Sequence, residues 1–207
     1  MYIAIEGPIG VGKTTLTRLL AKRLGTQKLM EVVEENPFLP LFYQDPANYS
    51  FKVQVFFLLS RYRQLIPLSQ PDLFGQGVVA DYLFDKDAIF ASLNLTGDEW
   101  RLYSDLYQSL APRIPAPSLT IYLRAPVAVL LERIRRRGRT FEQNMSPDYL
   151  ERLSRAYEQH FSSYPHPLWV LEADQVDYAN RTPDQDWVLE EVAKRLGINP
   201  ETLGQGQ

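Results

Sequence analysis

The sequence contains no cysteine and only two histidines among its 207 residues. The absence of cysteine excludes disulfides, thiolate metal sites and cysteine nucleophiles, and it fits a reducing compartment such as the cytoplasm. His160 and His166 alone make a poor zinc site, because zinc sites in proteins combine several nitrogen and sulfur ligands. The sequence therefore excludes disulfides and argues against a zinc site.

Positive charge and long apolar runs are also scarce. The formal net charge is −3, which counts against general nucleic-acid binding, since that function normally goes with a basic domain. The longest nearly uninterrupted apolar run, VQVFFLL at residues 53–59, is far too short to span a membrane. An apolar strand pattern starts at Tyr2, so we expect no targeting segment. We therefore expect a cytoplasmic protein with neither nucleic acid nor a membrane as its partner.

Five short β-rich runs alternate with helical patterns along the chain. The runs are YIAIE, MEVVEE, GVVAD, LTIYLR and LWVLEA, at residues 2–6, 30–35, 77–81, 119–124 and 168–173. Several are almost continuously apolar, as is typical of parallel strands buried on both faces. Helical patterns cover residues 13–24, about 51–66, 86–111 with a break near 96–97, 126–137, 147–161 and 185–196. The alternation predicts a three-layer α/β fold, with a five-stranded parallel sheet flanked by helices.

The domain organisation expected from this pattern is simple. No linker, repeat or low-complexity segment divides the chain, so we expect one domain over residues 1–198 and a polar tail at 199–207. Charged residues collect where the expected strands end, and ligands of open parallel sheets bind outside those strand ends. The residues concerned are Glu6, Glu34, Glu35, Asp81, Arg124, Glu172 and Asp174.

The motif GPIGVGKT, from Gly7 to Thr14, matches the phosphate-binding pattern G-x-x-x-x-G-K-[ST] between an expected strand and an expected helix. Its glycines allow backbone N–H groups to surround phosphate oxygens at a helix N-terminus. Lys13 would reach the β- and γ-phosphates, and the Thr14 hydroxyl would bind Mg²⁺. The motif predicts binding of ATP with Mg²⁺. The expected ATP-binding residues here are Gly7, Pro8, Ile9, Gly10, Val11, Gly12, Lys13, Thr14 and Thr15.

The segment RIRRRGR places five arginines between residues 133 and 139. It could hold nucleic acid, form a solvated helix face or close on a phosphate, and the acidic balance of the chain weakens the first interpretation. Arg133 and Arg137 lie one helical turn apart, so both can point at one ligand. Guanidinium groups stay charged and offer paired donors to phosphate oxygens.

A phosphate loop serves hydrolases, motors and kinases alike, so the acceptor must be inferred from other residues. A kinase that phosphorylates a hydroxyl needs a carboxylate near that hydroxyl. Glu34 and Glu35, at the end of the expected second strand, are candidates for this role. The alternative interpretation is that both are ordinary solvent-exposed carboxylates of a turn, and the sequence alone does not distinguish the two.

Taken together, these segments resemble the deoxynucleoside kinases, particularly the short bacterial deoxyadenosine/deoxyguanosine type, over nearly the whole chain. VVEENPF resembles the segment with the family's catalytic glutamate, which implies that role for Glu34. SFKVQVFFLLSRYRQL resembles the helix that reads the base, where Gln54 and Arg61 match the base-contacting residues. DYLFDKDAIFA resembles the segment in which an aspartate, here Asp87, pairs with that arginine. Tyr43 matches the tyrosine that senses the sugar 3′-hydroxyl.

The resemblance also accounts for the arginine run. The stretch ERIRRRGRTFEQNM resembles the family's lid, about residues 133–146, in which arginines close over the triphosphate. It implies catalytic roles for Arg133, Arg137 and Arg139, with the last two also binding ATP. Glu142 matches the glutamate that joins the tyrosine at the 3′-hydroxyl. The arginine run is thus interpreted as a phosphate lid.

One position departs from the family pattern. The family usually has an acidic residue followed by arginine after the third strand, and this chain has Asp81-Tyr82. Asp81 can still help to hold Mg²⁺ beside the substrate. Our hypothesis is that Lys86 supplies the missing positive charge near the acceptor.

The resemblance implies transfer of the γ-phosphate of ATP to the 5′-hydroxyl of a deoxynucleoside, with a purine as the expected base, in nucleotide salvage. It also implies a homodimer. Two alternatives remain open: a thymidylate-kinase-like enzyme and a non-catalytic nucleotide-binding member of the family. The first would need a basic residue after the second strand to hold an acceptor phosphate, and VVEENPFLPLFYQ contains none.

Overall fold

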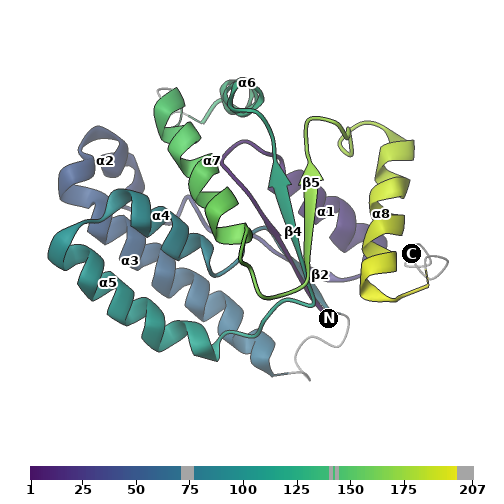
Figure 1. Ribbon diagram of the computed structural model, residues 1–207, viewed down its shortest axis with the longest axis horizontal. Helices are drawn as coiled ribbons and strands as arrows, with labels where there is room; N and C mark the ends of the chain where they lie inside the picture. Colours follow the sequence, from purple (N-terminus) through teal and green to yellow (C-terminus); the bar gives the residue numbers. More distant parts are fainter. Residues whose placement is uncertain (71–76, 140–141, 143–144, 200–207) are drawn as a thin grey trace.

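A single parallel sheet organises the molecule in the computed structural model, which describes residues 1–70, 77–139, 142 and 145–199 (Figure 1). Its strands follow the order β2-β3-β1-β4-β5, and each paired neighbour runs parallel. This confirms the predicted α/β fold class and the five-stranded sheet. The strands are β1 (Tyr2–Glu6), β2 (Gln27–Leu29), β3 (Val78–Ala80), β4 (Leu119–Arg124) and β5 (Leu168–Glu172).

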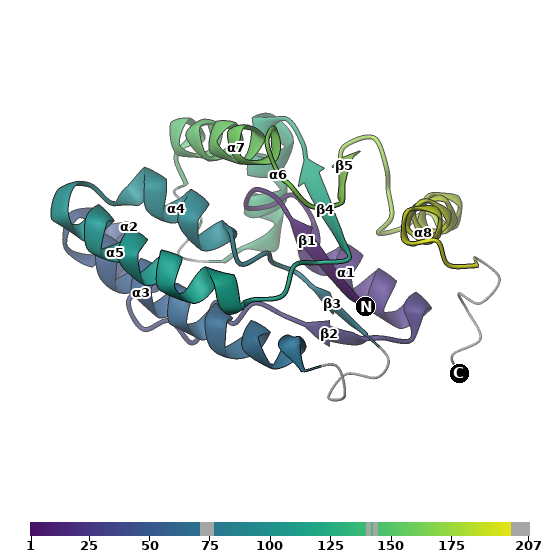
Figure 2. The ribbon, with the colours of Figure 1, turned by 60° about the horizontal axis from the view of Figure 1, so that its bottom comes forward.

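Helices cover both faces of this sheet, so the architecture has three layers. Figure 2 shows α1 and α8 on one side, and α3, α4, α5 and α7 on the other. The α-helices are α1 (Lys13–Leu24), α2 (Leu39–Gln44), α3 (Pro46–Leu65), α4 (Lys86–Asn94), α5 (Gly97–Leu110), α6 (Val127–Arg137), α7 (Pro147–Phe161) and α8 (Thr182–Leu196). Short 3₁₀ segments follow α3 at Ile66–Ser69 and α5 at Ala111–Arg113. Among the described helices, none combines the length and apolar character that a bilayer span requires.

The sheet forms where apolar residues can be covered from both faces. Every residue of β1 is buried, and β4 is buried up to its last residue, Arg124. The expected break between two helices is present at Leu95 and Thr96, directly before Gly97, which begins α5 with a φ of 57°. The arginine-bearing helix α6 ends as predicted at Arg137, before Gly138.

The second strand is where the sequence prediction was wrong. Residues 30–35 were expected to form it, but β2 is Gln27–Leu29, and the chain from residue 30 to residue 35 is irregular. Pairing with β3 lasts only from Gln27↔Val78 to Leu29↔Ala80, because β3 ends there. The apolar side chain of Val33, which suggested a strand, lines a cavity instead.

Several helix boundaries also differ from the prediction. Helix α2 lies outside the predicted helical ranges. Pro40 lies in its first turn, where the backbone N–H that proline lacks would have no partner within the helix. Helix α3 begins at Pro46 rather than near residue 51, and the Asp45 side chain caps it by accepting from the backbone N–H of Asn48 at 3.4 Å. Helix α8 begins at Thr182 rather than residue 185.

Candidate active site

The phosphate-binding loop connects β1 to α1, as the motif predicts. Gly7 has a φ of 149°, and a Cβ there would lie 2.2 Å from the carbonyl oxygen of Leu123. Gly12 has a φ of 110°, and a Cβ there would lie 2.5 Å from the hydroxyl of Tyr178. Neighbouring backbone and side chains therefore approach the loop too closely for any residue but glycine at these positions.

Lys13 lies inside this loop and donates to its carbonyl groups. Its Nζ is 2.5 Å from the Gly7 oxygen and 3.0 Å from the Pro8 oxygen. Burial, and then the neighbouring Lys86, lowers the pKa of Lys13 to about 8. An ammonium held in this way offers its charge to any phosphate that enters the loop.

The two residues predicted to bind the metal are brought together. The Thr14 hydroxyl donates to Asp81 Oδ2 at 3.0 Å, and Asp81 Oδ1 accepts from the backbone N–H of Glu31 at 2.6 Å. Burial, followed by the Glu31 carboxylate, raises the pKa of Asp81. One hydroxyl and one carboxylate suit Mg²⁺, which takes few protein ligands and completes its shell with phosphates and water.

Two cavities meet at the phosphate loop. The first, of about 360 Å³, lies among α2, α3 and α4, and the second, of about 560 Å³, lies beside α6 and residues 176–180. Both are of a size that holds small ligands. Gly10, Lys13, Thr14, Arg137 and Arg139 line both cavities. The arrangement can hold two molecules end to end, with shared cationic groups where they meet.

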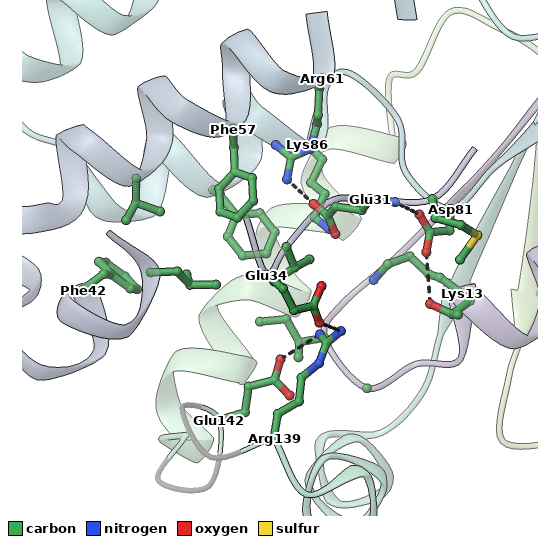
Figure 3. A pocket seen from close by; sticks show the side chains of 18 of the residues that line it. Lys13, Glu31, Glu34, Phe42, Phe57, Arg61, Asp81, Lys86, Arg139 and Glu142 are labelled. Carbon is green, nitrogen blue, oxygen red and sulfur yellow. Dashed lines mark hydrogen bonds and ion pairs between the residues drawn. The ribbon is translucent and has the colours of Figure 1, made fainter. Parts of the chain in front are cut away.

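A cluster of four charged residues lies at the first cavity, where Glu31, Arg61 and Lys86 line it (Figure 3) and Asp87 is buried behind Arg61. We name Glu31, Arg61, Lys86 and Asp87 the buried charge cluster. Arg61 forms ion pairs with Glu31 and Asp87, and Lys86 Nζ lies 2.6 Å from Glu31 Oε2. These side chains are at most 11% exposed, and their formal charges sum to zero.

The pKa values of the two carboxyl groups in this cluster are shifted in opposite directions. Burial alone would raise the pKa of the Glu31 carboxyl, but Lys86 and Arg61 together hold it well below its usual range. Burial raises the pKa of Asp87 to about 7, against the opposing charge of Arg61. Glu31 is therefore the carboxylate of the cluster that stays ionised at neutral pH, and it lines the cavity.

Glu31 was missed in the sequence, where Glu34 was preferred. Figure 3 shows Glu31 between Lys86 and Asp81, while Glu34 lies further out, against Arg139. The Glu34 side chain is 65% exposed, and its Oε1 is 2.6 Å from Arg139. The signal that could have found Glu31 is its place as the first acidic residue after the strand, but the misplaced strand concealed it.

The first cavity is lined by apolar and aromatic side chains together with polar ones. The predicted base-reading residues Gln54 and Arg61 are both buried on α3, and Arg61 lies over the ring of Phe57 at 4.8 Å. The predicted sugar-sensing residues Tyr43 and Glu142 line the same cavity. Lining residues that the sequence did not single out include Arg18, Met30, Phe42, Phe90, Asn94 and Tyr149.

Tyr82, which replaces the family's arginine, does not face the cavity. Its side chain is fully buried, and its hydroxyl donates to Gln64 Oε1 at 2.7 Å. Gln64 Nε2 in turn donates to the Met30 carbonyl at 3.4 Å, directly before Glu31. Tyr82 thus supports the chain that carries Glu31. Arg61 and Lys86 are the positive charges that pair with Glu31, and the role of Lys86 at the acceptor stays a prediction.

The predicted lid arginines fall into two groups. Arg137 pairs with Glu142, and Arg139 lies 2.6 Å from Glu34 and 3.5 Å from Glu142. Arg133 instead donates at 2.8 Å to the carbonyls of Val11 and Ala173, so it braces the phosphate loop against the end of β5. Residues 140, 141, 143 and 144 of the predicted lid, and residues 200–207 of the predicted tail, lie outside the described residues.

Comparison with known proteins agrees with this geometry. Residues 3–196 match the family described as deoxynucleoside kinase. The chain is 43% identical to a deoxyguanosine kinase of Bacillus subtilis over 76% of each chain, and 34% identical to a deoxyadenosine kinase of Lactobacillus acidophilus over 94% of this chain and 95% of that one. A solved deoxyadenosine kinase from M. mycoides, with dCMP and dCDP bound, superposes with a TM-score of 0.82 at 28% identity, covering 94% of this chain and all of that one.

Proposed function

This chain belongs to the deoxynucleoside kinase family, and we propose that its acceptors are purine deoxynucleosides. It is an ATP-dependent kinase of nucleotide salvage, and the similar deoxyguanosine and deoxyadenosine kinases support the choice of purines. The observation that carries the reaction is that the two cavities share Lys13, Thr14, Arg137 and Arg139, among other residues. A nucleoside in the first cavity and a triphosphate in the second would place the acceptor hydroxyl next to the γ-phosphate.

The experiment that tests this function measures phosphate transfer from ATP–Mg²⁺ to the four deoxynucleosides, the four ribonucleosides and thymidylate. We expect turnover of deoxyguanosine, deoxyadenosine or both, with the other acceptors slower. Thymidylate as the sole acceptor would contradict the proposal, and so would a preference for pyrimidines. Failure to phosphorylate any acceptor would favour the non-catalytic alternative.

In the proposed mechanism, Glu31 orients the 5′-hydroxyl or accepts its proton as the phosphoryl group moves. Glu31 suits this role because Lys86 and Arg61 keep it ionised, and because its backbone is held by Asp81. Glu34 remains the residue that the sequence predicts, although it is exposed and paired with Arg139. Lys13, Arg137 and Arg139 would stabilise the charge that spreads over the transferring group.

Matched substitutions separate the two glutamates. We expect Glu31→Gln to lower turnover by about 10²- to 10⁴-fold, the usual contribution of a positioned acid–base group. We expect Glu34→Gln to change turnover by less than roughly tenfold, because an exposed pair contributes little. Steady-state kinetics with the best deoxynucleoside checks both. The reverse order would return the role to Glu34.

Lys86 is proposed to replace the family's missing arginine at the acceptor. Its ammonium is buried beside Glu31 and lines the first cavity. We expect Lys86→Met, which keeps the length of the side chain, to lower turnover by on the order of 10²-fold, as for removal of one transition-state donor. Unchanged turnover in this variant would refute the role.

Thr14 and Asp81 are the residues that would hold Mg²⁺. When bound, the ion would neutralise charge on the phosphate oxygens of the nucleotide. The described residues contain no group of three or more carboxylate or histidine side chains that could hold a cation. A metal at this site would therefore depend on the nucleotide for most of its ligands.

The remaining proposals concern the sugar, the lid and the assembly. Tyr43 and Glu142 would contact the 3′-hydroxyl and favour deoxyribose, and residues 133–146 would act as the lid over the triphosphate. We also propose a cytoplasmic homodimer. Leu59 on α3 and Leu102 on α5 are 39% and 52% exposed and provide apolar surface on neighbouring helices. Mass measurement in solution checks the dimer.

A further inference from the structure

Glu6 is a buried carboxylate that lines neither of the two cavities. It is the last residue of β1, directly before the phosphate loop, and it is 0% exposed. In the described part of the chain, no ion pair includes it. A buried charge without an ionic partner must be stabilised by hydrogen bonds, so its donors identify what it holds in place.

Three donors from three parts of the chain meet at this carboxylate. Oε1 accepts from the backbone N–H of Gly7 at 2.8 Å and from the hydroxyl of Tyr157 at 2.9 Å. Oε2 accepts from the backbone N–H of Leu83 at 2.8 Å. Gly7 begins the phosphate loop, Leu83 follows Asp81, and Tyr157 lies on α7.

These bonds lie where the sheet itself stops connecting β1 to β3. The backbone pairing of the two strands ends at Ala4↔Ala80, while β1 continues to Glu6 on the side of β4. Beyond Ala80 the chain leads to Asp81 and Lys86, and the gap between it and the phosphate loop is the crevice where substrates would meet. The Glu6 carboxylate bridges that gap, because it accepts hydrogen bonds from Gly7 on one side and from Leu83 on the other.

We propose that Glu6 is a positioning residue for phosphoryl transfer. It sets the distance between the phosphate loop, which holds the donor, and the segment of Asp81 and Lys86, which serves the acceptor. Phosphoryl transfer depends on this distance, because a displacement of about 1 Å between reacting groups can lower the rate on the order of 10²-fold. The proposal rests on the kinase activity and does not depend on whether Glu31 or Glu34 contacts the acceptor.

Glu6→Gln tests the proposal with little change in shape. An amide oxygen can replace Oε1 for Gly7 and Tyr157, but the amide nitrogen then faces the N–H of Leu83, and that bond is lost. We expect kcat to fall roughly 10- to 100-fold, with the KM values for ATP and nucleoside within about threefold of wild type, because only alignment in the transition state is lost.

Two further variants separate positioning from general stability. Tyr157→Phe removes one bond to Glu6 and leaves both N–H bonds, so we expect kcat to fall about threefold with KM unchanged. Thr120→Val removes a buried hydroxyl that bonds Tyr164 at 3.0 Å, outside both cavities, and we expect wild-type kcat despite a lower Tm.

The outcomes are distinct. A fall in kcat at constant KM in Glu6→Gln, with a smaller fall in Tyr157→Phe, supports the proposal. Wild-type kcat in Glu6→Gln overturns it, and so does the same loss of kcat in Thr120→Val. If Glu6→Gln does not fold, Tyr157→Phe decides, and wild-type kcat in that variant overturns the proposal. An inactive wild-type enzyme would instead contradict the proposed function.

Discussion

The charged residues on the two sides of the active site differ in how they are held. In the buried charge cluster, each side chain is at most 11% exposed and each has a partner of opposite sign. On the other side, Arg137 and Arg139 are 37% and 31% exposed; Arg139 pairs with Glu34, which is 65% exposed, and both arginines pair with Glu142, which is 5% exposed. Buried charges cannot lose their partners without a large penalty, whereas exposed pairs exchange readily with water and ions.

Because of this difference, the two sides of the site can respond differently when a ligand binds. The cluster around Glu31 is organised before a substrate arrives, because its members satisfy one another. Arg137 and Arg139 contact carboxylates that phosphate oxygens could replace, since guanidinium groups bind both in the same paired geometry. The side with the buried charge cluster is therefore held by its own ion pairs, and on the proposed donor side the arginines can exchange a carboxylate for a phosphate.

The largest expected effect concerns stability. Arg61→Met would leave the carboxylates of Asp87 and Glu31 without their shared partner, and loss of one member of a buried pair typically costs about 3–5 kcal/mol. Arg139→Met removes the exposed pair with Glu34 and leaves Glu142 paired with Arg137, so it should cost less than about 1 kcal/mol. Urea unfolding of both variants measures the difference. Equal losses would show that the two sides are not held differently.

The next largest effect concerns catalysis on the donor side. Arg137→Met should lower turnover by about 10²- to 10³-fold, as for removal of one donor to developing charge. Nucleoside affinity should change much less than turnover, because the buried charge cluster remains intact and Glu142 keeps Arg139 as a partner. Arg135→Met is the matched control, since Arg135 is exposed on the same helix and lines neither cavity. Kinetics and calorimetry compare them, and equal effects would remove the specific role of Arg137.

The smallest expected effect concerns the pH dependence of stability, through Asp87 in the buried charge cluster. The pKa of Asp87 is raised to about 7, so the folded state holds this proton more tightly than the unfolded state. The stability that this group contributes is fully present below the ordinary pKa of aspartate, about 4, and is lost as the pH rises from there through 7, by at most ~1.4 kcal/mol per pH unit. Asp87→Asn should remove this component from urea unfolding curves measured between pH 5 and pH 8.

Asp98→Asn is the control for these unfolding measurements. Asp98→Asn changes an aspartate whose side chain is 96% exposed, so its stability should follow that of the wild type at each pH. If the curve for Asp87→Asn also runs parallel to that of the wild type, Asp87 is ionised throughout the range.

The sequence predicted those parts of the site that depend on local chemistry. The phosphate loop needs glycines, a lysine and a threonine at set spacings, and the structure places these between β1 and α1. The end of α6 was predicted as well, because Gly138 allows the φ of 73° that ends the helix. Signals of this kind lie within a few residues and do not depend on the rest of the fold.

Glu31 could not be chosen in the same way. Three glutamates lie between residues 31 and 35, and their chemistry is identical. The one that is buried beside Arg61 and Lys86 is decided by where β2 leaves the sheet, which depends on the length of β3. The roles of Tyr82 and Glu6 likewise depend on contacts with α3, α7 and the chain after β3.

The position of β1 in the sheet has a consequence for how the chain is made. This strand is synthesised first, yet its neighbours are residues 78–80 and 119–122. A central strand with such distant neighbours makes folding wait for long-range contacts. Because β1 carries the phosphate loop, the nucleotide site is complete only after most of the chain has left the ribosome. ATP can then stabilise finished molecules by binding to them, but it gives no such help to nascent chains.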